Sequence, residues 1–170
     1  MKQTRRAHLA MLGGTAAAVV MPATLKADGH GEAVMHEVQM LNADPENKRE
    51  RNVFGPAVLK VNVGDTVKFL NADRGHNAQI DDKMMPAGGD EWKGRINEEV
   101  EVTFTTEGTY GYYCQPHRAL GMVGLILVGD ASGNFEEAKA VKQRGKAAQR
   151  YETYFAMAEE MMAADAAAES

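Results

Sequence analysis

The sequence predicts a mainly β domain followed by two α-helices, and three observations support this fold class. Short apolar segments, separated by glycine and proline, recur from residue 34 to about residue 130. Residues 122–128 (MVGLILV) form an unbroken apolar run, as a strand covered on both faces would. After Gly129 the composition changes to alanine, glutamate, lysine and methionine, which favour helices. Closely spaced short strands of this kind are typical of a β-sandwich or a barrel.

The predicted strands follow one another within residues 34–130. Gly64 and Asp65 give a turn signal between two apolar segments, and residues 100–106 alternate apolar with polar side chains. The stretch 81–97 contains the sequence PAGG and is expected to form a long irregular loop with room for one turn of helix. Strands are expected at 34–41, 57–63, 66–71, 100–106, 109–114 and 122–128.

Residues 131–165 are expected to form helices that pack on the sandwich. Asn134 and Glu137 resemble a helix start, with the asparagine side chain as the N-cap. Gly145 is expected to break or bend the chain between helices at 135–144 and about 146–165. A stripe at helical spacing is expected to face the sheet as core, and the last residues, 166–170, are expected to fray. The stripe consists of Tyr151, Phe155, Ala158 and Met162.

Residues 1–27 resemble an export signal, with a basic start, an apolar segment at 9–20 and a processing point after Ala27. The pair Arg5–Arg6 resembles a twin-arginine signal, although His8 stands where phenylalanine is usual. Cleavage is preferred to a retained anchor, because the apolar segment is short and interrupted by glycine. Residues 28–33 then form a flexible leader, and the mature chain is expected in the periplasm without a membrane span.

The net charge and the cysteine content reduce the number of possible functions. The formal net charge of −5 becomes −9 after cleavage, because residues 1–27 hold four basic residues and no acidic one. An acidic chain of this kind is a poor candidate for binding nucleic acid. The single cysteine, Cys114, excludes an internal disulfide. In an exported protein a lone cysteine indicates an intermolecular bridge, a reactive thiol or a metal ligand.

Cys114, His117 and Met122 have the spacing C-x2-H-x4-M, and His76 lies upstream in the sequence DRGHNA. Two histidines, one cysteine and a weak axial methionine are the ligands of blue-copper electron-transfer sites. We therefore predict one type 1 copper ion at His76, Cys114, His117 and Met122. Pro116 removes a backbone N–H beside the thiolate, and Asn77 is placed to brace the two ligand-bearing loops.

Each of these residues also has a simpler interpretation. A lone cysteine is most often a small buried apolar residue, one methionine among 11 means little, and His117 or His76 can simply lie in a turn. Zinc also accepts cysteine and histidine. The combination of export, a single cysteine at a strand end and the ligand spacing favours copper.

A second copper site is a further hypothesis. If cleavage follows Ala27, the mature chain begins Asp28-Gly29-His30. A free amine, two backbone amides and the His30 imidazole can form a square-planar nitrogen set for Cu(II) or Ni(II). A leader without this role is the simpler alternative.

Together these stretches resemble the pseudoazurins, a group within the cupredoxin family. The resemblance covers about residues 34–165 and includes VQMLN, PAVLKVNVGDTVKFLNADRGHNA, MPAGGDEWKGRINEEVEVTF and CQPHRALGMVGLILVGD. It implies an eight-stranded Greek-key cupredoxin sandwich with two C-terminal helices, the four copper ligands and Asn77 as the brace. It also implies a single-electron carrier that reduces a copper nitrite reductase or exchanges electrons with a c-type cytochrome. Tyr113 and Gln115 depart from the usual residues beside the cysteine.

The expected mechanism is outer-sphere electron transfer by a monomer that is not an enzyme. An apolar patch around His117 is expected to dock redox partners, with nearby cations steering an acidic partner. The patch residues are Met85, Pro86, Ala119 and Leu120, and the cations are Arg74, Lys93 and Arg118. A periplasmic copper carrier or storage protein, which would hand over the metal, is the alternative. A copper oxidase or a Cys-His hydrolase is disfavoured, because no H-x-H pair and no oxyanion arrangement is evident.

Overall fold

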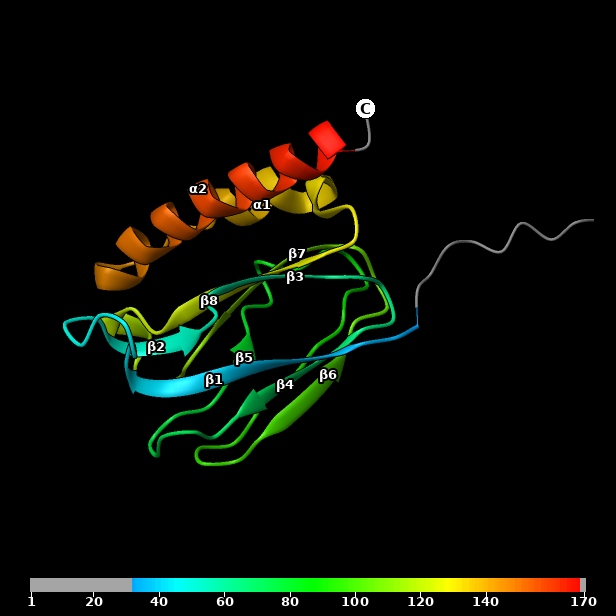
Figure 1. The fold of residues 1–170 in the computed structure, drawn as a ribbon. Helices are drawn as coiled ribbons and strands as arrows, with labels where there is room; N and C mark the ends of the chain where they lie inside the picture. The colour runs from blue at the N-terminus through cyan, green and yellow to red at the C-terminus, as the bar shows by residue number, and fades with distance from the viewer. Residues whose placement is uncertain (1–31, 169–170) are drawn as a thin grey trace, which may run out of the picture.

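The computed structural model describes residues 32–168. Eight strands form two four-stranded sheets, and the two α-helices cover the outer face of one sheet (Figure 1). The order β2-β1-β4-β6 makes the first sheet, and β3-β8-β7-β5 makes the second. The predicted sandwich with two C-terminal helices is confirmed. The first sheet contains β1 Met35–Ala43, β2 Arg51–Gly55, β4 Thr66–Leu70 and β6 Val100–Thr103. The second contains β3 Val58–Val61, β5 Gln79–Ile80, β7 Gly108–Tyr113 and β8 Val123–Val128.

Strand pairing explains how the ligand-bearing segments come together. β1 pairs with β4 in parallel, and β3 pairs with β8 in parallel, whereas the β1–β2, β4–β6, β5–β7 and β7–β8 pairs are antiparallel. Asn42 near the end of β1 lies 3.0 Å from His76, which follows β4, and His76 lies 3.9 Å from Cys114, which follows β7, so β1, β4 and β7 all run toward the same end of the sandwich. The loops that follow β4 and β7 carry His76 and Cys114, so the topology places both residues at that end.

Strand β8 is buried on both faces, as its unbroken apolar sequence predicted. Ile126 and Val128 belong to the core between the sheets, while Val123, Leu125 and Leu127 belong to the core beneath the helices. The predicted helical stripe completes this second core: Tyr151, Phe155 and Ala158 are buried and Met162 is partly buried. Gly124 faces the sandwich interior, where an added Cβ would lie 2.4 Å from Cζ of Tyr112.

Several predicted boundaries differ from the structure. The helices are α1 Phe135–Ala140 and α2 Gly145–Ala168, and two short 3-10 helices lie at η1 Arg118–Leu120 and η2 Ala131–Asn134. Helix α2 therefore continues through residues 166–168, which were expected to fray. Within 81–97 the structure has turns and a bridge between Gln79 and Lys93, and no helix. Strands β2 and β5 were missed, since β2 begins with two polar residues and β5 has only two residues.

Asn134 begins α1 at the expected position but does not cap it with its side chain. Its Oδ1 instead accepts the Thr109 N–H at 2.7 Å, and its Nδ2 donates to the Thr109 carbonyl at 2.9 Å. The side chain thus ties the helical segment to β7. The reason is that Thr109 is fully buried, and its backbone groups need partners more than a solvent-accessible helix end does.

Candidate metal centre

The segment between β7 and β8 is a compact loop closed by its own backbone. The Cys114 N–H donates to the Met122 carbonyl at 2.9 Å, and the Met122 N–H donates to the His117 carbonyl at 3.1 Å. Gly121 has a φ of 92°, which a residue with a side chain adopts at a penalty. The loop therefore fixes the backbone around Cys114, His117 and Met122 largely by local hydrogen bonds.

His76 reaches this loop from the connection after β4. The donor atoms of His76, Cys114 and His117 all lie within 4.8 Å of one another. The two Nδ1 atoms lie 3.0 Å apart, and Sγ of Cys114 lies 3.9 Å from Nδ1 of His76 and 3.6 Å from Nδ1 of His117. Cys114 and His76 are fully buried, whereas His117 is partly exposed. The tertiary structure thus brings together three of the four predicted ligands at their donor atoms.

Asn42, which the sequence did not single out, orients His76. Its Oδ1 lies 3.0 Å from Nε2 of His76. An amide oxygen only accepts, so Nε2 carries the proton and the lone pair of the neutral ring is on Nδ1. That lone pair faces Cys114 and His117. Asn42 lies 34 residues before His76, and no local sequence pattern connects the two.

Asn77 joins the two ligand-bearing segments as expected. Its Oδ1 accepts the Gln115 N–H at 2.7 Å, immediately after Cys114. Its Nδ2 donates to the Gly94 carbonyl at 3.0 Å and to Oε1 of Gln79 at 3.2 Å. Asn77 is 1% exposed, so this fully bonded amide fixes the Cys114 segment relative to the His76 segment.

Burial sets the protonation states of the cluster. Burial raises the pKa of the Cys114 thiol, although the backbone N–H groups of Asn77 and His117 partly oppose this. Burial, followed by the neighbouring His117, lowers the pKa of His76. Without a cation the cluster therefore favours a neutral thiol and a neutral imidazole, whereas a coordinated thiol loses its proton. One soft sulfur with two imidazole lone pairs suits copper.

The backbone of Met122, the fourth predicted ligand, is tied directly to this cluster. Met122 is fully buried within the core between the sheets. Its N–H and carbonyl are bonded to His117 and Cys114 respectively, so its backbone is fixed directly to two of the three converging residues.

The predicted docking residues do not all lie in one place. Leu120 is 52% exposed, and Pro116 and Ala119 beside it are also exposed. Pro86, in contrast, is buried at the start of β7, where a Cβ added to Gly108 would lie 2.8 Å from its Cγ. Met85 packs partly buried against the core between the sheets. The expectation that Pro86 belongs to the surface around His117 is therefore wrong, because the 81–97 loop turns it inward.

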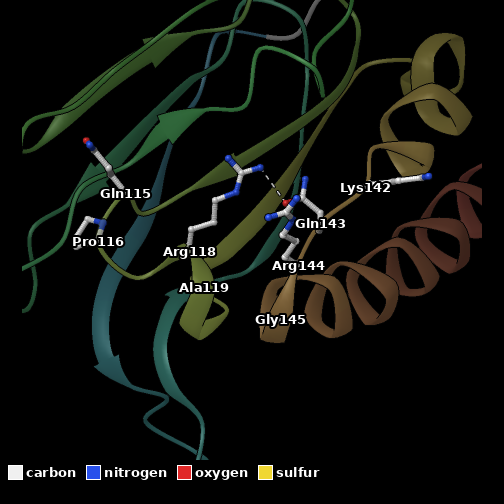
Figure 2. Close-up of a pocket in the computed structure, with 8 residues that line it drawn as sticks. All are labelled: Gln115, Pro116, Arg118, Ala119, Lys142, Gln143, Arg144 and Gly145. Carbon is white, nitrogen blue, oxygen red and sulfur yellow. Dashed lines mark hydrogen bonds between the residues drawn. The ribbon is translucent and has the colours of Figure 1, made fainter.

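The three predicted cations differ in their surroundings. Arg74 and Lys93 are exposed. Arg118 is partly buried, forms an ion pair with the buried carboxylate of Asp81, and lies 4.1 Å above the Tyr113 ring. Its Nη2 also donates to Oε1 of Gln143 at 2.9 Å, as Figure 2 shows. Its charge is largely balanced inside the protein, so it contributes less to long-range steering than the sequence suggested.

A surface hollow of about 540 Å³ adjoins the ligand loop (Figure 2). We call it the basic hollow. One side is formed by the ligand loop and the other by the connection between α1 and α2, where Lys142 and Arg144 are exposed. Its lining residues are Gln115, Pro116, Arg118, Ala119, Lys142, Gln143, Arg144 and Gly145. The sequence did not identify Lys142 and Arg144 as neighbours of the ligand loop, because it placed them in an expected helix at 135–144, whereas α1 ends at Ala140.

Three predictions lie wholly or mostly outside the described residues 32–168: the export signal at 1–27, the flexible leader at 28–33, and the second copper site at Asp28 and His30. Among the described residues, no helix is long and apolar enough to cross a membrane.

Comparison with known proteins places the chain in a family. Residues 41–129 match the family described as copper binding proteins, plastocyanin/azurin family. The pseudoazurin of Methylorubrum extorquens is 37% identical over 147 residues, which cover 86% of this chain and 95% of that protein. The pseudoazurin of Paracoccus pantotrophus is 39% identical over 126 residues, covering 74% of this chain and 85% of that one. The chain belongs to the pseudoazurins of the plastocyanin/azurin family.

The solved structures agree with this assignment. The crystal structure of pseudoazurin from Hyphomicrobium denitrificans superposes with a TM-score of 0.68 at 36% identity, covering 72% of this chain and 97% of that one. Membership of a copper-binding family makes copper the cofactor, in agreement with the soft donor set found at the cluster.

Proposed function

We propose that the chain is a periplasmic type 1 copper protein that carries single electrons, with His76, Cys114, His117 and Met122 as its ligands. The observation that supports the proposal best is the convergence of one thiol and two imidazole nitrogens within 4.8 Å. Asn42 and Asn77 hold these groups from outside the cluster. When bound, copper supplies one-electron redox chemistry at this position.

The surroundings of the cluster favour a carrier over an enzyme or a metal donor. Cys114, His76 and Met122 are fully buried, so little space is left for a substrate or for rapid metal exchange. Only His117 is partly exposed, and the exposed apolar residues Ala119 and Leu120 follow it closely. An imidazole edge within an apolar patch gives a short path for an electron and excludes water from a transient contact.

Optical spectroscopy with metal exchange tests this function. The oxidised, copper-loaded protein should show an intense band in the red that disappears on reduction and is absent from Cys114→Ser. Electron self-exchange should be fast while copper loss to a chelator is slow. A colourless copper complex contradicts the ligand proposal. Fast copper loss with slow self-exchange instead supports the carrier or storage alternative.

The redox partner is proposed to be a protein with an acidic docking face, either a copper nitrite reductase or a c-type cytochrome. Exposed Lys142 and Arg144 at the basic hollow, with Arg74 and Lys93, supply positive charge near the ligand loop despite a formal net charge of −5. The match to pseudoazurins supports this partner class.

Stopped-flow kinetics with each candidate partner tests the steering. Charge reversal in Lys142→Glu with Arg144→Glu should slow the second-order reaction more at low salt than at high salt, because screening weakens the lost attraction. Lys139→Glu is the control for a charge reversal away from the hollow, to be compared with Lys142→Glu alone, since Lys139 lies on α1 outside the hollow and pairs with Glu159. Equal slowing at both salt concentrations contradicts steering by this surface.

Mass spectrometry of the exported protein tests cleavage after Ala27 and hence the periplasmic assignment.

A further inference from the structure

A buried arginine from the long C-terminal helix contacts the loop that carries Met122. Arg150 is 7% exposed, although it is charged. Its Nη1 donates to the Gly121 carbonyl and to the Asn52 carbonyl, both at 2.7 Å. Its Nη2 donates to Oε2 of Glu50 at 2.6 Å and to the Arg51 carbonyl at 2.9 Å. One guanidinium thus joins α2, the start of β2 and the ligand loop.

The Gly121 carbonyl and the Met122 N–H belong to the same peptide group. Arg150 donates to the carbonyl side of this group, and the His117 carbonyl accepts from its N–H side at 3.1 Å. The peptide plane that precedes Met122 is therefore held on both sides. The Gly121 carbonyl also accepts the Val123 N–H at 2.9 Å. Hydrogen bonds from a charged donor are stronger than neutral ones, so the Arg150 bond is the strongest single contact to this peptide group.

The fit around Gly121 supports the same role. A Cβ added at Gly121 would lie 3.0 Å from Cδ of Arg150 and 3.0 Å from Cγ of Lys146. Helix α2 thus rests directly on the backbone of the ligand loop. Glu50 forms ion pairs with both Arg150 and Lys146, and hydrogen bonds from these two side chains lower the pKa of its carboxyl. The carboxylate neutralises the buried guanidinium and keeps it in place.

We propose that Arg150 is a positioning residue for Met122, so that α2 helps to set the distance between the metal and its axial thioether. The proposal rests on Met122 being the axial ligand. The axial ligand tunes the potential of blue-copper sites, and a guanidinium with four acceptors resists displacement of the loop better than local loop bonds alone. The C-terminal helix therefore acts on the metal centre as well as covering the sheet.

Amide hydrogen exchange in the metal-free protein tests the mechanical part of this proposal. Arg150→Lys keeps the positive charge but removes the two guanidinium nitrogens that together donate to four acceptors. It should speed exchange of the Met122 N–H about tenfold, the amount expected for loss of one charge-assisted hydrogen bond. Lys139→Met, on the surface of α1, is the control and should leave that exchange unchanged. Unchanged Met122 exchange in a folded Arg150→Lys protein overturns the proposal.

The copper-loaded protein tests whether the effect passes through Met122. Arg150→Lys should shift the reduction potential and the visible spectrum, and both shifts should vanish when Met122→Leu is already present. Shifts of equal size in both backgrounds would show that Arg150 acts independently of Met122. If Met122→Leu alone leaves the reduction potential unchanged, Met122 is not the axial ligand. This result distinguishes failure of the proposed ligand set from failure of the proposed role of Arg150.

Glu50→Gln provides a test if Arg150→Lys does not fold. It removes the carboxylate that holds Nη2 and leaves the donors of Arg150 intact. Exchange of the Met122 N–H should rise by a smaller factor in the same direction. No rise in the folded Glu50→Gln protein overturns the proposal.

Discussion

The two ends of the sandwich use buried polar side chains in opposite ways. At one end the Asp65 carboxylate accepts the Val34 N–H and lies 2.9 Å from Nε2 of His36, and the Asn134 amide bonds to the Thr109 backbone, so these polar groups pair with protein partners. At the other end, the supporting amides of Asn42 and Asn77 are paired, but Nδ1 of His76 and Nδ1 of His117 face each other at 3.0 Å. Paired groups stabilise the fold, whereas two ring nitrogens that converge beside a thiol form a set of donors for a metal ion.

Removal of the thiol should have the largest effect and should be confined to the ligand end. Cys114→Ser should lose the visible colour of the copper protein and most of the stabilisation that copper gives. For a metal at about 1,000 times its dissociation constant that stabilisation is about 4 kcal/mol. The metal-free variant should lose only about 1–3 kcal/mol of unfolding free energy, the cost of a hydroxyl at this buried position, measured by denaturation followed by circular dichroism. A large loss of stability without metal would mean that Cys114 also serves the core.

Loss of the Asn134 amide should have the next largest effect and should be confined to the opposite end. Asn134→Ala leaves the buried N–H and carbonyl of Thr109 without this partner. Unfolding should become easier by roughly 2–4 kcal/mol, since each such group accounts for about 1–3 kcal/mol. Equilibrium denaturation measures this effect. The visible spectrum of the copper-loaded variant should stay unchanged, and a spectral shift would show that the two ends are coupled.

Acidic pH should lower the stability that the Asp65 carboxylate gives to its end of the sandwich. Asp65 is 2% exposed, and burial acts to raise the pKa of its carboxyl. The N–H groups of Val34 and Asn62 and the His36 ring, with Nε2 2.9 Å from Oδ2, outweigh burial and lower that pKa. A lowered pKa gives stability that is present above the ordinary value of about 3.9 and is lost as the pH falls through the folded value.

Asp65→Asn should therefore be less stable than the parent at pH 7, by about 1–2 kcal/mol from the hydrogen bonds it weakens. This difference should shrink as the pH falls below the ordinary value of about 3.9 and on through the lower pKa of the folded parent. Urea denaturation at several pH values measures the difference. A gap that stays constant down to low pH would contradict the assigned role of the ionised carboxylate.

Loss of Asn42 should have the smallest effect on stability and a selective effect on the metal. Asn42 is exposed, so water can replace its Oδ1 at Nε2 of His76. Asn42→Ala should change the unfolding free energy of the metal-free protein by less than about 0.5 kcal/mol, as at other surface positions. Copper affinity should fall by about tenfold, the lower limit for such supporting groups. Competition with a chelator measures this, and an unchanged affinity would remove Asn42 from the site.

The ligand loop and the doubly buried strand could be predicted because their signals are local. The C-x2-H-x4-M spacing places three side chains on one short loop, and the apolar run of β8 reports burial on two faces. Asn77 could be predicted as the brace because it adjoins His76. In contrast, Asn134 was expected to cap a helix, and Pro86 was expected at the surface. Both expectations failed because these two side chains pack against the start of β7: Asn134 bonds to Thr109, and Pro86 lies against Gly108.

The sequence by itself determined the fold class, the family and the identity of the candidate ligands, because periodicity, composition and short motif spacing depend only on residues that are near one another in the chain. Only the tertiary structure decided which lone pair His76 presents, that Asp81 balances Arg118, and that Arg150 holds the Gly121–Met122 peptide. These contacts join residues 34, 37 and 29 positions apart. The physical reason is that a hydrogen-bonding group accepts any suitable partner, and packing of the strands and helices determines which partner comes within reach.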